Sequence, residues 1–296
     1  GVGCFFALFA VPLQADELLV RDGQYIHLTT DIASTEEAEI LVASFDAAIP
    51  QWAEFWNLDK ESLTDFKVEA CVIRNKANFN QSGLIPATVP NFPFGYAIGN
   101  QVWVLAQQSE YYTRHLLLHE GIHSLAYHLF KGAGPTWFQE GTAELLATHH
   151  GAGRDIKINR IPLSREDAPY WGRFKRMGQS TESGEVPSFN AVLGYQPNLT
   201  GDVATYSWSW AACMILSSYP EYRSAFITAA ERGQETGPAF NRELQSSLGK
   251  QWPILAARWR IACHDLDYGF DWQREQVKLS AKDPLWNGDD LQIQVR

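Results

Sequence analysis

Basic residues are scarce in this sequence and form no run. The 296 residues include 24 Lys and Arg against 34 Asp and Glu, which gives a formal net charge of −10. Because nucleic-acid binding usually needs a basic face, we expect no nucleic acid among the partners. Charged residues are 20% of the chain and apolar residues 45%, so the composition predicts an ordered protein with a sizeable core.

Cysteine is also scarce, with four in the chain and no two at the Cys-x-x-Cys spacing. This excludes a metal site built from cysteines. Beyond the N-terminal segment, Cys213 and Cys263 fall in stretches with helical spacing and could pair in an oxidising compartment, leaving Cys71 single. Three buried free thiols are an equally good interpretation.

No apolar run is long enough to cross a bilayer, so we expect no transmembrane span. The run at residues 5–13 (FFALFAVPL) has the length of the apolar part of a signal peptide, and Ala15 suits a cleavage site. We therefore interpret residues 1–15 as a signal-peptide remnant and expect a secreted or periplasmic location. Cys4 precedes the apolar run instead of following it, which disfavours a lipoprotein. A buried N-terminal strand is the alternative.

Internal repeats and low-complexity stretches are absent as well, and the main feature of the chain is a change of periodicity near residue 109. Before it, alternating apolar residues predict strands, and one stretch with helical spacing opens at Ser34 and bends near Pro50. The predicted strands are residues 25–30, 66–74 and 95–105, the last with a bend at Gly99–Asn100; the helix is 35–55 and the loop is 75–93.

After residue 109 the spacing is helical. A helix is predicted over residues 110–130, then a break at 131–135, where Pro135 can open a second helix that runs to about His149. Residues 154–200 predict long loops with short helices. Further helices are predicted at 205–218, 221–232, 237–248 and 252–265, with an irregular tail or linker at 271–296. The chain is thus predicted to be an α+β protein, in which residues 16–270 form one domain with an α/β part to 109 and a helical part from 110.

The first of these long helices carries the pattern His-Glu-x-x-His, as His119, Glu120 and His123. Two histidines four residues apart lie one turn apart on the same face, so both imidazoles can reach one metal ion. Glu120 is next to the ligands without pointing at the metal, and it can take a proton from a metal-activated water. The alternative is a pair of satisfied helix histidines on a polar stripe.

A catalytic zinc site needs three protein ligands and an open position. The segment 137–144 (WFQEGTAE) offers Glu140 as the third ligand, because the break at 131–135 lets the second helix return across the metal. Glu144 shares its helix face and is placed to accept the outer N–H of a ligand histidine; a solvated acid is the alternative. His115 lies one turn before His119 and could close the site, but a histidine at the rim or behind the ligands is the better interpretation, and a plain surface histidine is the one we expect. We assign no chemistry to His149 or to its neighbour.

These two segments, HEGIH and WFQEGTAE, resemble the gluzincin clan of zinc peptidases, which includes thermolysin and aminopeptidase N. The Trp-x-x-Glu-Gly-x-Ala part is closest to the aminopeptidase branch. Over most of residues 25–270, including 206–211 (YSWSWA), the chain resembles an uncharacterised group of secreted bacterial proteins of the peptidase MA-like superfamily, common in planctomycetes. The resemblance implies a zincin-like fold, in which a small mixed β-sheet lies over an active-site helix and a mainly helical subdomain follows.

The resemblance also implies roles for individual residues. His119, His123 and Glu140 would be the zinc ligands, and Glu120 the general base and acid. A tyrosine downstream of the third ligand, matched here by Tyr206, would polarise the substrate carbonyl and stabilise the oxyanion, as a phenol O–H can do. The alternative for Tyr206 is a half-buried helix aromatic.

One departure from the family bears on the reaction. Aminopeptidases of the clan carry a Gly-x-Met-Glu-Asn motif on the strand before the metal-binding helix, and its Glu holds the free amine of the substrate. The equivalent strand here, residues 95–105, has no acid. We therefore expect an endopeptidase that binds peptide or protein by pairing with this strand. The alternatives are a zinc-binding scaffold of the same fold without turnover, and a metallohydrolase on cell-wall material, which only the eleven Trp suggest.

Overall fold

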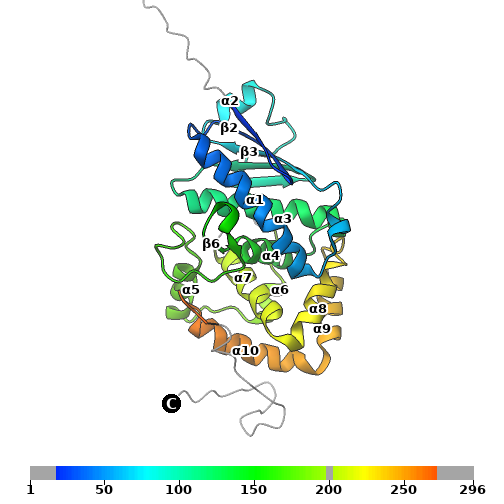
Figure 1. The fold of residues 1–296 in the computed structure, drawn as a ribbon. Helices are drawn as coiled ribbons and strands as arrows, with labels where there is room; N and C mark the ends of the chain where they lie inside the picture. Colours follow the sequence, from blue (N-terminus) through cyan, green and yellow to red (C-terminus); the bar gives the residue numbers. More distant parts are fainter. Residues whose placement is uncertain (1–17, 198–202, 272–296) are drawn as a thin grey trace, which may run out of the picture.

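A five-stranded mixed sheet forms one end of the protein, in a computed structural model that describes residues 18–197 and 203–271 (Figure 1). The strand order is β1-β2-β3-β5-β4, with β2, β3 and β5 parallel and the two outer strands antiparallel to their neighbours. The strands are β1 (Leu19–Asp22), β2 (Ile26–Thr30), β3 (Val68–Ile73), β4 (Gly95–Ile98) and β5 (Gln101–Leu105). The predicted signal-peptide remnant lies outside the described residues, and so does the predicted tail apart from Asp271.

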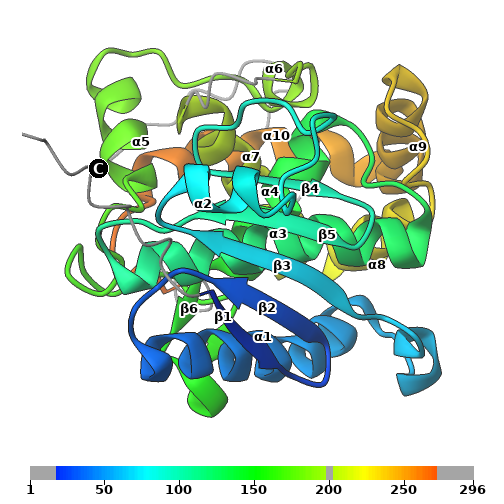
Figure 2. The same ribbon diagram turned by 90° about the horizontal axis from the view of Figure 1, so that it is seen from above.

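The two faces of the sheet carry alternate residues, as strand geometry requires. Val68, Ala70 and Val72 of β3 face the main core, whereas Cys71 and Ile73 face a smaller cluster on the other side. On the main face, α1 (Thr35–Trp56) lies under β1 and β2, and α3 (Glu110–Phe130) lies under β3, β5 and β4 (Figure 2). This arrangement buries α3 between the sheet and the rest of the chain.

The smaller cluster on the far face of the sheet includes a helix where a loop was predicted. Residues 75–93 contain α2 (Lys76–Gln81), which begins because the Asn75 side chain accepts a hydrogen bond from the Ala77 N–H. Phe79 of this helix packs with Trp103 on the sheet. The prediction of an uninterrupted loop was therefore wrong at this point.

The predicted strand over residues 95–105 is in fact a hairpin. The bend at Gly99–Asn100 is a two-residue turn in which Gly99 has φ +58, and β4 folds back antiparallel on β5 with Ile98 opposite Gln101. As a result, β4 is the last strand of the sheet, and its outer edge is not paired with any described strand.

Helix α3 has the predicted bounds and begins at Ser109, whose hydroxyl accepts from the Tyr112 N–H. Lys131 (φ 59) ends it in the left-handed conformation, and α4 (Thr136–Ala147) begins directly after Pro135. The second helix therefore ends two residues before the predicted His149. A third helix, α7 (Val203–Ser218), crosses α4 closely: a Cβ added to Gly141 would lie 2.3 Å from the Ser209 carbonyl oxygen.

In Figure 1 the sheet lies at the top, with α3, α4 and α7 below it in that order. The remaining segments complete the helical part. His149–His150 form β6, which pairs with β7 (Lys157–Ile158), so this stretch is extended where helix was predicted. The other helices are α5 (Arg173–Glu182), α6 (Phe189–Leu193), α8 (Pro220–Ala230), α9 (Pro238–Leu248) and α10 (Trp252–Asp265), with short 3-10 helices at Lys60–Leu63, Gly153–Asp155 and Gly249–Gln251. The predicted α+β class with a mixed sheet is confirmed.

Two further sequence predictions have outcomes in the fold. Within the described part of the chain, no helix is both long enough and apolar enough to cross a membrane. Cys71, Cys213 and Cys263 are free, buried thiols, so the pairing of Cys213 with Cys263 does not form. The physical reason is that each thiol is enclosed separately: the Cys213 Sγ, for example, lies 3.9 Å from the Trp137 carbonyl oxygen, deep between α7 and α4.

Candidate metal centre

Two histidines and one glutamate converge where α3 and α4 cross. His119 and His123 lie one turn apart on α3, with ring centroids 4.8 Å apart, and Glu140 reaches them from α4. The Glu140 Oε2 atom lies 3.2 Å from the His119 Nε2 and 3.7 Å from the His123 Nε2. One ligand atom from each residue falls within 4.8 Å of the others, so this largely buried group could hold a metal ion.

The spacing of these atoms suits a small tetrahedral ion. Bonds of about 2.0–2.1 Å in a tetrahedral site imply ligand atoms about 3.3 Å apart. The two measured separations, 3.2 and 3.7 Å, bracket that value before any ion draws the ligands in. Two imidazoles and one carboxylate are also the donor types that zinc takes. The residues therefore fit the metal that the sequence predicted.

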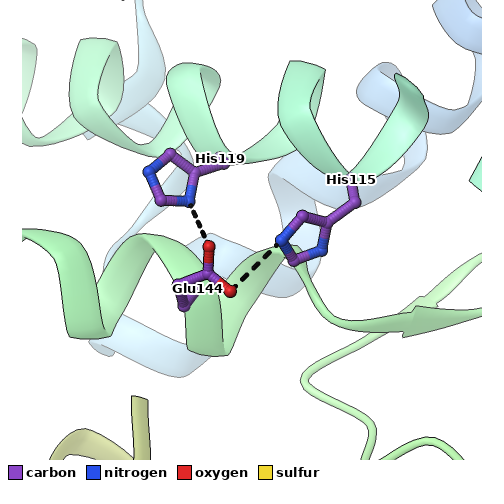
Figure 3. Close-up of side chains that lie close together, drawn as sticks. All are labelled: His115, His119 and Glu144. Atoms are coloured by element: carbon purple, nitrogen blue, oxygen red, sulfur yellow. Dashed lines mark ion pairs between the residues drawn. The ribbon is translucent and has the colours of Figure 1, made fainter. Parts of the chain in front are cut away.

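Behind the histidines lies Glu144, one turn after Glu140 on α4 and only 1% exposed. Its Oε1 lies 3.2 Å from the His119 Nδ1, the ring nitrogen that faces away from Glu140 (Figure 3). The contact is at ion-pair distance, although the ring N–H is not aligned for a hydrogen bond. Glu144 thus lies where a carboxylate can orient His119, and it is not a solvated acid.

Glu144 is itself held by residues from a loop and helix far along the chain. Both its oxygens accept from Arg173, at 3.0 Å from Nε and 2.6 Å from Nη2, and the Trp171 indole N–H donates at 3.3 Å. Arg173 is 5% exposed. Burial disfavours the charged carboxylate, but Arg173, His115 and His119 together outweigh it and hold the pKa of Glu144 well below its usual range.

His115 is completely buried, so the surface position that we expected is wrong, and the residue lies behind the candidate ligands. Its Nε2 lies 3.3 Å from the Glu144 Oε2 (Figure 3). Its ring also stacks with those of Tyr111 and Tyr112. The prediction was wrong because it treated one face of α3 as open to solvent, whereas α4 and the following chain enclose that face. Burial lowers the pKa of His115, with Glu144 opposing it, so the ring stays neutral at pH 7.

A second group of possible ligands shares two of these residues. His115, His119 and Glu144 also offer atoms within 4.8 Å of one another. In this group, however, the carboxylate already has a full cationic partner in Arg173, which contacts both oxygens. The group around Glu140 has no such cation among the described residues, so it is the better candidate for a metal ion.

Glu120 lies beside the metal group and against the start of β4. A Cβ added to Gly95 would lie 2.5 Å from the Glu120 Oε1, so glycine leaves the space that this carboxylate occupies. Burial raises the pKa of Glu120, while His123 and His119 oppose the rise. The carboxylate is therefore a stronger base than an exposed glutamate, and it lies against the first residue of β4.

Tyr206, in the first turn of α7, also reaches the group. Its ring centroid lies 6.0 Å from that of His119, and the Arg173 guanidinium carbon lies 5.6 Å from the Tyr206 ring centre. The close crossing at Gly141 sets this position, because it holds α7 against α4. Burial, and then the charge of Glu140, raise the pKa of Tyr206, so its hydroxyl stays protonated and able to donate.

The carboxylates draw positive charge to the centre of the site. Burial opposes a charged imidazole at His119, but Glu140 and Glu144 together raise its pKa well above the usual value. Burial likewise opposes the charged form of Glu140, yet His123 and His119 lower the pKa of that carboxyl to about 2. A cation, whether a proton or a metal ion, is thus favoured between these residues.

Sequence reasoning missed some of the residues that build this centre. Arg173 and Trp171 come from a stretch predicted only as loops with short helices, and no local pattern marks them. Gly95 is the first residue of β4, and no sequence motif marks it. His149, to which no chemistry was assigned, is buried in β6 and accepts from the Arg114 Nε at 3.0 Å, with burial lowering its pKa to about 3. It supports α3 and does not face the metal group.

Comparison with protein-family models and with curated proteins finds no match to this chain. The interpretation of the site therefore depends on its geometry and on the motifs that build it.

Proposed function

We propose that this protein is a zinc-dependent endopeptidase of the gluzincin type, with a zincin-like arrangement of sheet and active-site helix. The observation that carries the proposal is the buried convergence of His119, His123 and Glu140, with Glu120 beside them. Three protein ligands of this kind leave one position open, which is typical of catalytic rather than structural zinc. Bound zinc would lower the pKa of a water molecule and polarise the scissile carbonyl.

Glu120 takes the proton from the attacking water and passes it to the leaving amine. Its burial supports this role, because a carboxylate with a raised pKa accepts and returns a proton near neutral pH more readily. Gly95 supports it as well, since the absence of a side chain there keeps the carboxylate in place and open to substrate.

Tyr206 donates its hydroxyl proton in a hydrogen bond to the carbonyl oxygen as negative charge develops. Its position in the first turn of α7, near His119, and its raised pKa both suit a donor that stays protonated. Glu144 keeps the His119 ring in one orientation, and Arg173 keeps Glu144 charged.

The free edge of β4 is where an extended peptide would bind. Backbone groups on that edge have no described strand as partner, and the strand begins at Gly95 beside Glu120. The hairpin narrows the predicted binding strand to its first half, because β5 is paired on both sides and, of the two hairpin strands, only β4 has an unpaired edge for substrate. No acid lies on β4 to hold a free amine, which favours internal cleavage.

The test compares wild type with Glu120→Gln after both are shown to bind one zinc ion by metal analysis. We expect wild type to cleave casein or a peptide library and Glu120→Gln to lose at least about 100-fold in kcat. Glu54→Gln, on the exposed face of α1, is the matched control and should keep full activity. Equal cleavage by wild type and Glu120→Gln would refute the mechanism. Bound zinc without turnover on peptides or peptidoglycan would favour a binding scaffold.

A further inference from the structure

A pocket of about 480 Å³ opens beside the metal centre, between the entrance to β4 and helix α5. Phe94 and Gln108 line it on the side of the sheet, and Lys175 and Arg176 on the side of α5. The Tyr170 hydroxyl donates to the Gln108 Oε1 at 2.9 Å and joins the two sides. The volume is within the range of ligand pockets and can take one or two substrate side chains.

This pocket is cationic in a protein that is otherwise acidic. The chain has a net charge of −10, yet none of the described residues that line the pocket carries a carboxylate. Arg173 at its base is neutralised by Glu144, but Lys175 and Arg176 form no ion pair with any described residue. The amides of Gln107 and Gln179 add neutral donors at the wall.

The pocket borders the segments that carry the groups of the proposed reaction. Phe94 directly precedes Gly95, which lies against the Glu120 carboxylate. On the opposite wall, Val203 lies one turn before Tyr206 on α7. A peptide that pairs with β4 and reaches the metal centre therefore presents a side chain or a chain end to this pocket.

We propose that the pocket is a specificity site for a carboxylate of the substrate, which Lys175 and Arg176 bind. This inference rests on the proposed peptidase function and names its substrate class: peptides with an acidic group close to the cleaved bond. The carboxylate can be an Asp or Glu side chain or the free C-terminus of the peptide. Because both cations are partly or fully solvent-exposed, their effect depends on ionic strength.

The experiment measures kcat/KM on matched peptides in which one position near the cleaved bond is Glu, Gln or Lys, each with a free or an amidated C-terminus. We expect roughly a tenfold preference for Glu over Gln at one position, or for the free over the amidated end, decreasing in high salt. The double variant Lys175→Glu with Arg176→Glu should reverse the preference towards Lys. Lys250→Glu, an exposed lysine far from the pocket along the chain, is the control and should keep the preference of wild type.

A binding measurement separates failure of the pocket from failure of the peptidase function. The same peptides, labelled with a fluorophore, are titrated into Glu120→Gln protein with zinc bound. Tighter binding of the acidic peptide, lost in the charge-reversed variant, supports the pocket even if wild type cleaves nothing. Cleavage with equal kcat/KM for Glu, Gln and Lys and for both chain ends overturns the pocket proposal, and so does a preference that the charge reversal leaves unchanged.

Discussion

Replacing Glu144 with Gln tests the buried ion pair behind the metal centre. The substitution keeps the size of the side chain but removes its charge, so Arg173, 5% exposed, would be left without a full counter-charge. Breaking a buried pair in this way costs about 3–5 kcal/mol, because the remaining charge cannot regain its hydration. We therefore expect Glu144→Gln to lower the free energy of unfolding by that amount.

The measurement is urea unfolding in the presence of a chelator, so that metal binding does not contribute to stability. With a slope of about 3 kcal/mol per molar urea, the midpoint should fall by about 1–1.7 M. Glu235→Gln is the matched control. Glu235 also pairs with an arginine, Arg232, at 2.7 Å, but both of these side chains are more than a third exposed. Water screens that pair, so its midpoint should stay near that of wild type.

Removing both partners gives the complementary result. The double variant Glu144→Leu with Arg173→Met leaves no unpaired charge. It should be less destabilised than the sum of the two single variants.

Glu144→Gln should also weaken zinc affinity by about 10- to 100-fold, because His119 loses the carboxylate that orients it. The reasoning is refuted if Glu144→Gln unfolds at the same urea concentration as the Glu235→Gln control.

Three other substitutions or modifications test particular contacts. Gly95→Ala should lower kcat about 10-fold or more with little change in stability, because the new Cβ would displace the Glu120 carboxylate; peptide cleavage and urea unfolding check the two parts. Gly141→Ala should destabilise the protein by about 1–3 kcal/mol in urea unfolding, because its Cβ would collide with the Ser209 carbonyl and push α7 from α4. Cys71 should not react with a thiol reagent at pH 8 until the protein unfolds, because burial raises its pKa to about 12 and keeps the thiol protonated.

A glycine in open space is the control for the first two substitutions. Gly178 lies within α5, and a Cβ added there meets nothing within 4 Å. Gly178→Ala should stabilise the protein by about 0.5–1 kcal/mol, since alanine is the better helix former. If Gly95→Ala or Gly141→Ala behaves like Gly178→Ala, the close contacts at those two glycines do not constrain the site. Rapid labelling of Cys71 in the native protein would contradict its burial.

The helices and the three candidate metal ligands could be predicted from local sequence patterns. The spacing of apolar residues and the break at 131–135 predicted α3 with its observed bounds, because each hydrogen bond of a helix involves residues close in sequence. The same periodicity puts His119 and His123 on one face, and the break at 131–135 brings Glu140 back to them. Short-range geometry sufficed for all three residues.

Pairing between strands was less accessible to sequence reasoning. Residues 95–105 alternate as one strand would, and only the fold shows that the turn at Gly99 reverses the chain and leaves β4 as the free edge. Likewise, helical spacing that continues to about His149 could not show that this residue would leave the helix and pair with Ile158. Backbone partners in a sheet are chosen by tertiary packing, which spacing within one segment does not encode.

The sequence by itself determined a helix with two histidines on one face, since helical periodicity places residues three or four apart together, and a return helix that carries Glu140. Only the tertiary structure decided what surrounds them: that His115 is enclosed, that Arg173 meets Glu144 across 29 residues of chain, and that Gly95 makes room for Glu120. Contacts between distant segments depend on how the whole core packs, and no periodicity of the chain specifies them.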